Sequence, residues 1–249
     1  MRNKPHRNAL FPSGTTAVVT GASSGIGRAI ALALARHGVR LCLVGRNPAA
    51  LSRAAAAAGR SSKVFPFQID LASEENFEPL IRCVRRIGRL DFLIHSAGVI
   101  QENRMEQARI DDLDLQFATN VRAPYLLTQK LLPMLLAAHG LIVFLNSSAG
   151  LSAKRPDIGQ YAATKHALRA VADSLREELN PKGVRVLSLY LGRVATPMQE
   201  AIFRNLKSPY RPERMLQPED VASIVVHSLR LPSSVEITDI SVRSAQKSQ

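Results

Sequence analysis

The sequence predicts a single domain of the α/β class, built on a doubly wound parallel sheet. Short, strand-like runs alternate with longer stretches of helical spacing over most of the 249 residues. The strand-like runs are apolar almost throughout, as expected when helices cover both faces of a parallel sheet. No repeat, low-complexity linker or change of composition marks a second domain. Right-handed crossovers then place helices on both faces of the sheet.

The expected elements follow from these runs in chain order. The strands cover residues 16–20, 40–45, 63–68, 91–95, 141–146, 184–190 and 235–240. The helices cover residues 25–36, 48–58, 73–87, 111–138 and 161–180. The segment from Pro197 to Pro218 is rich in proline and has no clear strand. It is either a mobile flap over a substrate or a plain surface loop.

The composition is that of an ordinary globular protein. Hydrophobic residues make up 46% of the chain and charged residues 21%, both usual values. Without tryptophan and with only 5% aromatic residues, a surface that stacks single-stranded nucleic acid is poorly supplied. Cys42 and Cys83 have no metal-ligand spacing and are too few for a disulfide framework. We expect them to be buried, reduced thiols of a cytosolic protein that holds no metal.

The net charge of +13 and the pI near 10.5 are the unusual features. The basic residues are scattered, with one local cluster formed by Arg2, Lys4 and Arg7. Such a charge either keeps the protein soluble or attracts an anionic partner, and a basic pocket would favour a phosphorylated cofactor.

Residues 1–14 are expected to form a flexible basic tail. They contain charges but no apolar stretch of signal-peptide length. The most apolar region, residues 125–145, is interrupted by polar residues, proline and glycine, so it does not resemble a membrane span. We therefore expect a cytoplasmic protein that has no membrane partner.

A glycine-rich turn, residues 20–27 (TGASSGIG), follows the first expected strand and opens the first expected helix. In this context Gly21 lets the chain turn tightly, Gly25 lets the backbone approach a pyrophosphate, and Gly27 lets helix and strand pack closely. The N–H groups and the positive end of the helix then bind phosphate groups. The turn predicts a dinucleotide site that also includes Ser23, Ser24 and Ile26.

The spacing of this turn, T-G-x-x-x-G-x-G, resembles that of the short-chain dehydrogenase/reductase family, and the chain length fits it too. The resemblance extends from Thr16 to about Ile240. It implies a Rossmann fold whose seven strands lie in the order 3-2-1-4-5-6-7. It also implies hydride transfer between a nicotinamide cofactor and an alcohol or carbonyl substrate.

The end of the second expected strand bears on the choice of cofactor. An acidic residue at this position would bind the adenosine ribose and favour NAD(H), but the chain has Gly45 there, followed by Arg46. A guanidinium group pairs well with a 2′-phosphate, so we expect NADP(H) to be preferred over NAD(H). The alternative is that Arg46 is only a solvent-facing side chain.

The resemblance implies further cofactor contacts at the ends of later strands, where ligands bind in such sheets. Residues 96–98 match a motif that usually reads Asn-Ala-Gly, with serine in place of asparagine. Residues 191–196 resemble a segment that closes on the nicotinamide, with leucine in place of proline. The implied cofactor contacts are Asp70 and Leu71 near the adenine, then Ser96, Ala97, Gly98, Gly192, Val194 and Thr196.

Tyr161 and Lys165 form the expected acid–base pair, and both also belong to the expected cofactor contacts. They are four residues apart, so they share one face of a helix. A free tyrosine, with a pKa of about 10, is a poor base near neutral pH. We expect the Lys165 ammonium to lower the pKa of Tyr161 by favouring the phenolate.

A serine hydroxyl should orient the substrate oxygen, and two serines are candidates. Counted from the flanking glycines, the family's serine is Ser147; counted back from Tyr161, it is Ser148. We choose Ser147, because the loop at residues 152–157 accommodates one extra residue more easily than a strand does. Both assignments stay open on the sequence alone.

Asn120 matches an asparagine that, in the family, kinks the fourth long helix and helps to hold a water linking Lys165 to solvent. Asn120, Ser147, Tyr161 and Lys165 are therefore the expected catalytic residues. His95 and His166 have no metal-ligand spacing and are expected to be structural.

The function that these residues predict is an NADP(H)-dependent carbonyl reductase or alcohol dehydrogenase acting on CH–OH groups. The alternative is a non-catalytic NADP-binding regulator or interaction protein, although such a protein needs no acid–base pair. An acidic carrier protein as partner, or nucleic acid, has support from the net charge alone. Family members often assemble through their long helices, so we expect a homodimer or homotetramer.

Substrate specificity is expected to lie in residues 151–157 and 197–217, because loops rather than the fold determine it. The apolar side chains in and beside these segments suggest an apolar pocket; they are Ile158, Met198, Ile202, Phe203 and Leu206.

Overall fold

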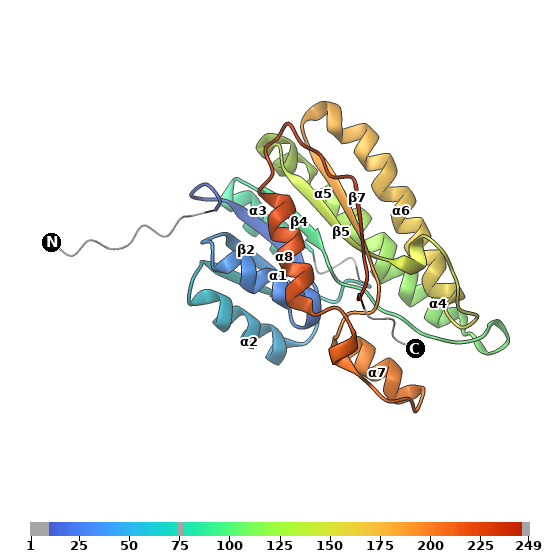
Figure 1. Ribbon diagram of the computed structural model, residues 1–249. Helices are drawn as coiled ribbons and strands as arrows, with labels where there is room; N and C mark the ends of the chain where they lie inside the picture. The colour runs from blue at the N-terminus through green and yellow to red at the C-terminus, as the bar shows by residue number, and fades with distance from the viewer. Residues whose placement is uncertain (1–9, 74–76, 246–249) are drawn as a thin grey trace.

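The computed structural model describes residues 10–73 and 77–245, and these form a seven-stranded sheet between two layers of helices (Figure 1). The order is β3-β2-β1-β4-β5-β6-β7 and every neighbouring pair is parallel. The predicted sheet and strand order are thereby confirmed. The strands are β1 (Thr16–Thr20), β2 (Arg40–Gly45), β3 (Val64–Gln68), β4 (Phe92–His95), β5 (Leu141–Ser147), β6 (Arg185–Leu191) and β7 (Asp239–Val242).

Eight α-helices connect these strands within the described residues. They are α1 (Gly25–Ala35), α2 (Pro48–Gly59), α3 (Glu78–Ile87), α4 (Ile110–Phe117), α5 (Ala123–Ala138), α6 (Gly159–Leu179), α7 (Pro197–Asn205) and α8 (Pro218–Leu229). None of them has the length and apolarity that a membrane span requires.

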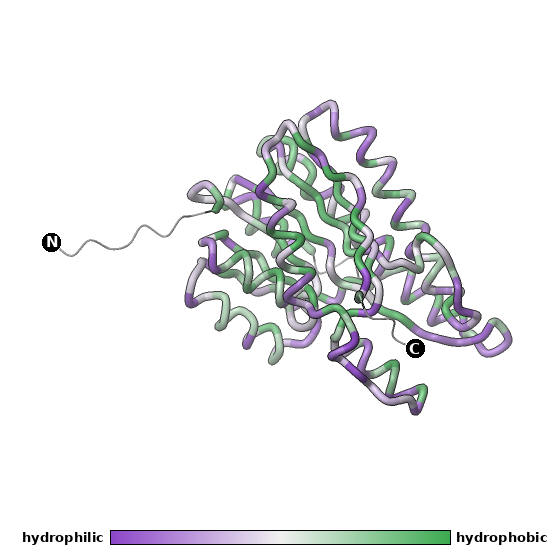
Figure 2. Tube along the Cα trace, in the orientation of Figure 1, coloured by the Kyte–Doolittle hydropathy of each residue, from purple (hydrophilic) through white to green (hydrophobic). Residues whose placement is uncertain are grey.

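The strands are apolar on both sides because each side faces a layer of helices. Along β1, Ala17 and Val19 belong to a buried cluster with residues of α1, α2 and α8. Val18, between them, belongs to a second cluster with residues of α3, α5 and α6. Figure 2 shows the resulting concentration of hydrophobic residues along the central strands. Burial of both faces therefore explains the uninterrupted apolar runs.

The predicted helix 111–138 is divided in the structure. A π-helical turn, Ala118–Arg122, separates α4 from α5. π-Helical turns inside α-helices occur frequently at functional sites. Asn120, where the family resemblance implied a kink, lies within this turn.

The region after β6 contains two helices that our sequence analysis did not identify. Thr196 caps α7 and Pro197 occupies its first turn, so residues 197–205 are helical rather than a loop. Gln217 and Asp220 form a capping box at the start of α8. The buried side of α8, which includes Val221 and Val225, packs against α1.

The last strand was also misplaced in our sequence analysis. β7 begins at Asp239 instead of Val235, which is 40% exposed. Glu236 is used differently: its carboxylate accepts a hydrogen bond from the Val186 N–H (3.3 Å) and another from Asn180 (2.6 Å). The approach to β7 is therefore attached to β6 at Glu236 by a side chain, before backbone pairing begins at Thr238.

Parts of two expected segments lie outside the described residues. These are residues 1–9 of the expected basic tail and residues 74–76 of the expected helix 73–87. The described end of the tail packs on the domain, since Phe11 is buried and its ring lies 5.4 Å from that of Phe92. Likewise, Phe77 packs in the core just before α3 begins.

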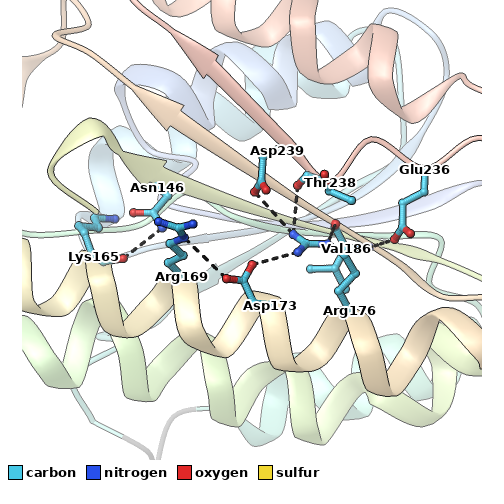
Figure 3. Close-up of polar contacts among 9 residues, drawn as sticks. All are labelled: Asn146, Lys165, Arg169, Asp173, Arg176, Val186, Glu236, Thr238 and Asp239. Carbon is cyan, nitrogen blue, oxygen red and sulfur yellow. Dashed lines mark hydrogen bonds and ion pairs between the residues drawn. The ribbon is translucent and has the colours of Figure 1, made fainter. Parts of the chain in front are cut away.

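Arg176 attaches α6 to the sheet (Figure 3). Its guanidinium donates to the carbonyls of Val186 (3.2 Å) and Thr238 (3.1 Å). It also pairs with Asp173 at 2.9 Å and Asp239 at 3.6 Å. Because α6 carries Tyr161 and Lys165, these contacts to β6 and the start of β7 fix the helix that brings both side chains to the sheet edge.

Candidate active site

Two adjoining cavities open at the carboxyl ends of the parallel strands. The first, of about 340 Å³, lies over the glycine-rich turn and the ends of β2 and β3. The second, of about 240 Å³, lies over the ends of β5 and β6 beside α6. Ile26, Thr196 and Met198 line both, as does the turn at residues 96–98. Every site residue that we predicted lines one of these cavities, except Asn120.

The glycine-rich turn is shaped by close backbone packing. Gly21 has a φ of +66°, and a Cβ on it would lie 2.9 Å from the backbone of Ala97. A Cβ on Gly27 would lie 2.5 Å from the carbonyl oxygen of Gly21. Within the described residues, Ser24 precedes α1 without capping it by its side chain. The N–H groups of the first turn of α1 are thus suited to bind an anionic group at the first cavity.

Thr20 connects the glycine-rich turn to the neighbouring strand end. Its hydroxyl accepts hydrogen bonds from the N–H groups of Ser96 (3.0 Å) and Ala97 (3.1 Å). It donates toward the carbonyl of Ile94 at 3.4 Å. Sequence analysis noted Thr20 only as part of the motif, whereas the structure shows that it holds the turn at residues 96–98 in place.

The far end of the first cavity is lined by Gly45, Arg46 and Asp70. A Cβ on Gly45 would lie 3.0 Å from the Cβ of Ser23, so an acidic side chain there would require Ser23 to shift. Arg46 is exposed at the cavity, and the Asp70 carboxylate accepts from the Ala72 N–H at 3.1 Å. This end of the cavity thus presents the Arg46 guanidinium. At the neighbouring position 45, an acidic side chain would not fit without a shift of Ser23.

Tyr161, Lys165 and Ser147 meet at the second cavity. The Ser147 side chain interacts with the Tyr161 phenol in the direction that lowers the phenol's pKa. The Lys165 ammonium lies 5.7 Å from the centre of the Tyr161 ring and donates to the carbonyl of Leu145 at 3.1 Å. α6 supplies the first two side chains and the end of β5 supplies the third.

The electrostatics of this group differ from our expectation. Burial raises the pKa of Tyr161 to about 12, and the interaction with Ser147 opposes part of that rise. Burial also lowers the pKa of Lys165 to about 8. The predicted lowering of the Tyr161 pKa by Lys165 is not found: burial dominates, and the Lys165 ammonium donates to the Leu145 carbonyl. Tyr161 is therefore protonated at neutral pH and can donate a proton.

The structure distinguishes the two candidate serines. Ser147 ends β5, is partly buried, accepts from the Ala149 N–H at 3.1 Å, and interacts with the Tyr161 phenol. Ser148 is exposed and begins a short 3₁₀ turn, Ser148–Gly150. Both line the second cavity, but it is Ser147 that is brought to the Tyr161 hydroxyl.

Asn120 lies behind the second cavity, where it holds two segments together. Its side-chain oxygen accepts from the Val99 N–H (2.8 Å), and its amide donates to the Val99 carbonyl (2.9 Å) and to Thr164 (3.1 Å). A Cβ on Gly98 would lie 3.3 Å from this oxygen and 3.8 Å from the Lys165 ammonium. Asn120 therefore connects the turn after β4 to α6 at a point close to Lys165.

Asn146 is a positioning residue that our sequence analysis missed. Its amide donates to the carbonyl of Lys165 at 3.2 Å (Figure 3), and its oxygen accepts from the Ser147 N–H at 2.8 Å. One side chain thus connects the strand that carries Ser147 to the helix that carries Lys165. The available signal was a polar residue at the end of an otherwise apolar strand.

The segment between β6 and α7 forms the wall shared by the cavities. A Cβ on Gly25 would lie 3.1 Å from the Thr196 methyl group, so this segment touches the glycine-rich turn. Val194 pairs with Leu216 in a short parallel bridge. Leu191, which stands where the family has proline, continues β6 and pairs with Val242.

The outer wall of the second cavity is charged, which the sequence did not indicate. Arg155 contacts Glu102 at 3.0 Å and Asp157 at 2.6 Å, and both Arg155 and Glu102 line the cavity. Of the expected apolar residues, Ile158 and Met198 line this cavity. Residues 102 and 155 are far apart in the chain, so no local pattern connects them.

The histidines and Cys42 are accounted for by packing. His95 stacks on Phe144, bonds to Thr128 at 2.9 Å, and has its pKa lowered to about 3 by burial. His166 bonds to the carbonyl of Ala162. Burial raises the pKa of the Cys42 thiol. In the described part of the chain, no group of three or more side chains could hold a metal ion.

Comparison with known proteins identifies the family. Residues 15–207 match the family profile described as short chain dehydrogenase. The chain belongs to the short-chain dehydrogenase/reductase family. Uncharacterised oxidoreductases of Staphylococcus epidermidis and Staphylococcus aureus are 32% and 33% identical to it, over 229 and 232 residues; each match covers 91% of this chain and 96% of the relative.

Solved structures of this family show the same fold. An alcohol dehydrogenase from the archaeon Thermococcus sibiricus, complexed with 5-hydroxy-NADP, has a TM-score of 0.84 and 29% identity, covering 94% of this chain and 98% of the other. A metagenomic short-chain oxidoreductase in complex with NADP has a TM-score of 0.79 and 29% identity, covering 92% and 97%. The chain is thus an oxidoreductase of this family with a single-domain Rossmann-like fold.

Proposed function

We propose that this oxidoreductase transfers hydride between NADP(H) and an alcohol or carbonyl substrate. The observation that carries the proposal is the group formed by Tyr161, Ser147 and Lys165 at the cavity adjoining the glycine-rich turn. A protein that only binds a nucleotide needs no such proton donor.

The residues around the first cavity fit NADP(H). The glycine-rich turn and the start of α1 would hold the pyrophosphate, and the Arg46 guanidinium would pair with the 2′-phosphate. Arg46 lines the cavity, and Gly45 leaves no carboxylate to repel that phosphate. The solved relatives that carry NADP or 5-hydroxy-NADP support the same choice.

The nicotinamide supplies the hydride, and the protein supplies the proton and the orientation. Tyr161 would donate its phenolic proton to the carbonyl oxygen as the alcohol forms, since burial keeps it protonated at neutral pH. Ser147, whose side chain interacts with the Tyr161 phenol, would position that oxygen beside the phenol. Lys165, held by Leu145, would supply positive charge next to the tyrosinate left behind.

The raised pKa of Tyr161 keeps its side chain at neutral pH in the phenol form that carbonyl reduction uses. Reduction needs the phenol, which is the form that burial stabilises. Alcohol oxidation needs the phenolate, so its rate should rise with pH as more tyrosinate forms.

The remaining parts of the proposal concern assembly and location. We propose a homo-oligomer formed through α4 and α5, because Ile110, Phe117 and Tyr125 on these helices are 68%, 37% and 51% exposed. We also propose that the protein works in the cytoplasm, where the thiols of Cys42 and Cys83, both free in the structure, stay reduced.

The test is oxidation of NADPH, with NADH in parallel, against a broad panel of carbonyl compounds. Replacing Tyr161 by Phe removes the proton donor and keeps the ring, so turnover should fall by about 10²–10⁴-fold while NADPH binding, measured by calorimetry, is retained. Turnover that Tyr161→Phe leaves unchanged would refute the mechanism. NADPH binding without turnover of any compound would instead favour the non-catalytic regulator.

A further inference from the structure

A third cavity, the arginine cavity, adjoins the second cavity at Arg193. It has a volume of about 360 Å³. Its walls come from the residue after Gly192, from the end of α7 and from the segment that returns to α8. Its lining residues are Arg193, Phe203, Leu206, Ser208, Pro209, Arg211, Arg214 and Met215.

Three arginines therefore meet a small, partly apolar space. Arg193 lies over the Phe203 ring, with its guanidinium carbon 5.0 Å from the ring centre. In the described ranges, no carboxylate forms an ion pair with Arg193, Arg211 or Arg214. Glu213, between the last two in sequence, is exposed and does not line the cavity. A cavity lined by one sign of charge concentrates ligands of the opposite sign.

The position of these arginines is fixed by the backbone. The Leu216 N–H donates to the Arg193 carbonyl at 3.1 Å, and the Ala195 N–H donates to the Leu216 carbonyl at 2.8 Å. The Gln217 amide bonds to the carbonyls of Pro212 and Met215 (2.9 and 3.1 Å) and holds the turn between Arg211 and Met215. The segment from Pro197 to Pro218, which the sequence predicted as a flap or a loop, thus contributes a fixed wall to the arginine cavity.

Arg193 connects the arginine cavity to the cavity in which we propose that the reaction takes place. It lines both the arginine cavity and the second cavity, which holds Tyr161 and Ser147. The arginine cavity shares no lining residue with the first cavity, where Arg46 lies. A ligand that extends from Tyr161 past Arg193 would therefore reach Arg211 and Arg214 without competing with a bound dinucleotide.

We propose that the arginine cavity binds the anionic end of the substrate, a carboxylate or phosphate carried on an apolar chain whose carbonyl group lies at Tyr161. This inference rests on the proposed function and specifies its substrate class. The planar forks of arginine pair with both oxyanions, and Phe203, Leu206 and Met215 offer apolar contacts for the chain. It also assigns a local purpose to part of the net charge of +13.

The first experiment compares anionic and neutral forms of one substrate series. Methyl ketones with a terminal carboxylate on chains of increasing length are assayed with NADPH beside their methyl esters. The wild-type enzyme should favour the acid by roughly tenfold or more in kcat/KM, mainly through KM, at one preferred length, as expected for a charge-assisted contact. The double variant Arg211→Gln/Arg214→Gln should lose this preference and keep its activity on the esters.

Two outcomes of this assay would overturn the proposal. One is an equal loss of activity on acids and esters in the double variant. The other is an unchanged preference for the acid. The matched control is Arg204→Gln, an exposed arginine of α7 whose side chain lies 3.8 Å from Glu200 and does not line the cavity.

A second measurement tests the site without catalysis. Inorganic phosphate, added at constant ionic strength, should raise the Tm of the wild type and of Arg204→Gln, but not that of the double variant. Arg46→Gln should keep the response; its loss there would place the phosphate at the first cavity and refute the site. If phosphate binds the arginines but no carbonyl compound is reduced, the substrate assignment fails together with the proposed function, whereas no response in the wild type refutes the site itself.

Discussion

The first cavity, which we propose to bind the cofactor (the cofactor cavity), and the second, which we propose to bind the substrate (the substrate cavity), share a wall but differ in their lining residues. Among the described residues, the first has five glycines in its lining and two charged side chains, Arg46 and Asp70. The second has two glycines and four charged side chains, Glu102, Arg155, Lys165 and Arg193. Backbone shape determines the first cavity, whereas side-chain chemistry determines the second.

This difference determines which substitutions each cavity tolerates. At Gly21 and Gly27 a single added Cβ would meet backbone atoms at 2.9 and 2.5 Å, so the turn admits little change. The outer wall of the substrate cavity consists of side chains such as Arg155 and Arg193, which can be replaced without moving a strand. In the proposed function, the common fold thus determines the cofactor cavity, and side chains added to it determine the substrate cavity.

Among neighbouring positions of the substrate cavity, we expect the largest difference in effect between two adjacent serines. Ser147→Ala removes the hydroxyl that we propose to orient the substrate oxygen and should lower kcat by about 10²–10³-fold. Ser148→Ala, on the exposed neighbour, should stay within a few-fold of the wild type. Both are measured as NADPH-dependent reduction at saturating substrate, and NADPH affinity serves as the control for folding. A larger loss for Ser148→Ala would move the catalytic serine by one residue.

In the same cavity, the buried charge of Lys165 serves the proposed reaction but lowers the stability of the fold, and this cost can be measured. Its folded pKa, about 8 rather than 10.5, means that burying its charge costs up to about 3 kcal/mol below pH 8. Between pH 8 and 10.5 the unfolded state binds more protons than the folded state, so this cost disappears as pH rises. Lys165→Met should therefore be inactive yet more stable than the wild type at pH 7, and the difference should shrink toward pH 10.

Urea denaturation of the two proteins across this pH range measures the effect. Lys182→Met, which changes an exposed lysine near Glu178, is the matched control and should show no such trend. If Lys165→Met is instead less stable than the wild type at pH 7, the hydrogen bond from Lys165 to the Leu145 carbonyl outweighs the cost of burying the charge.

The same contrast explains how much the sequence could predict. The glycine-rich turn, the ends of the strands and the Tyr161–Lys165 pair are local patterns, and each of them lies at one of the two cavities. The seven-strand order came from resemblance to the family, since periodicity alone does not define which strands are neighbours. The helices α7 and α8 were missed although Thr196 and Gln217 are recognisable cap residues, because the prolines were interpreted as loop signals.

Contacts between distant segments could not be predicted from local patterns. Arg155 meets Glu102, and Asn146 bonds to the Lys165 carbonyl, only after the sheet has brought their segments together. The pKa of Tyr161 was predicted in the wrong direction for the same reason. Spacing of four residues on a helix does not reveal that Leu145 binds the ammonium or how deeply the phenol is buried.

The smallest effect concerns Arg46, a side-chain contribution to the cavity that is otherwise made of backbone. Because Arg46 is exposed, its pairing with a 2′-phosphate is screened, and Arg46→Gln should raise KM for NADPH about tenfold while leaving KM for NADH unchanged. The effect should weaken as salt is added, and kcat should change little. Arg53→Gln, another exposed arginine but on α2 and outside the cavity lining, is the control. If KM rises equally for both cofactors, Arg46 shapes the cavity in general and the selectivity for NADPH must come from backbone.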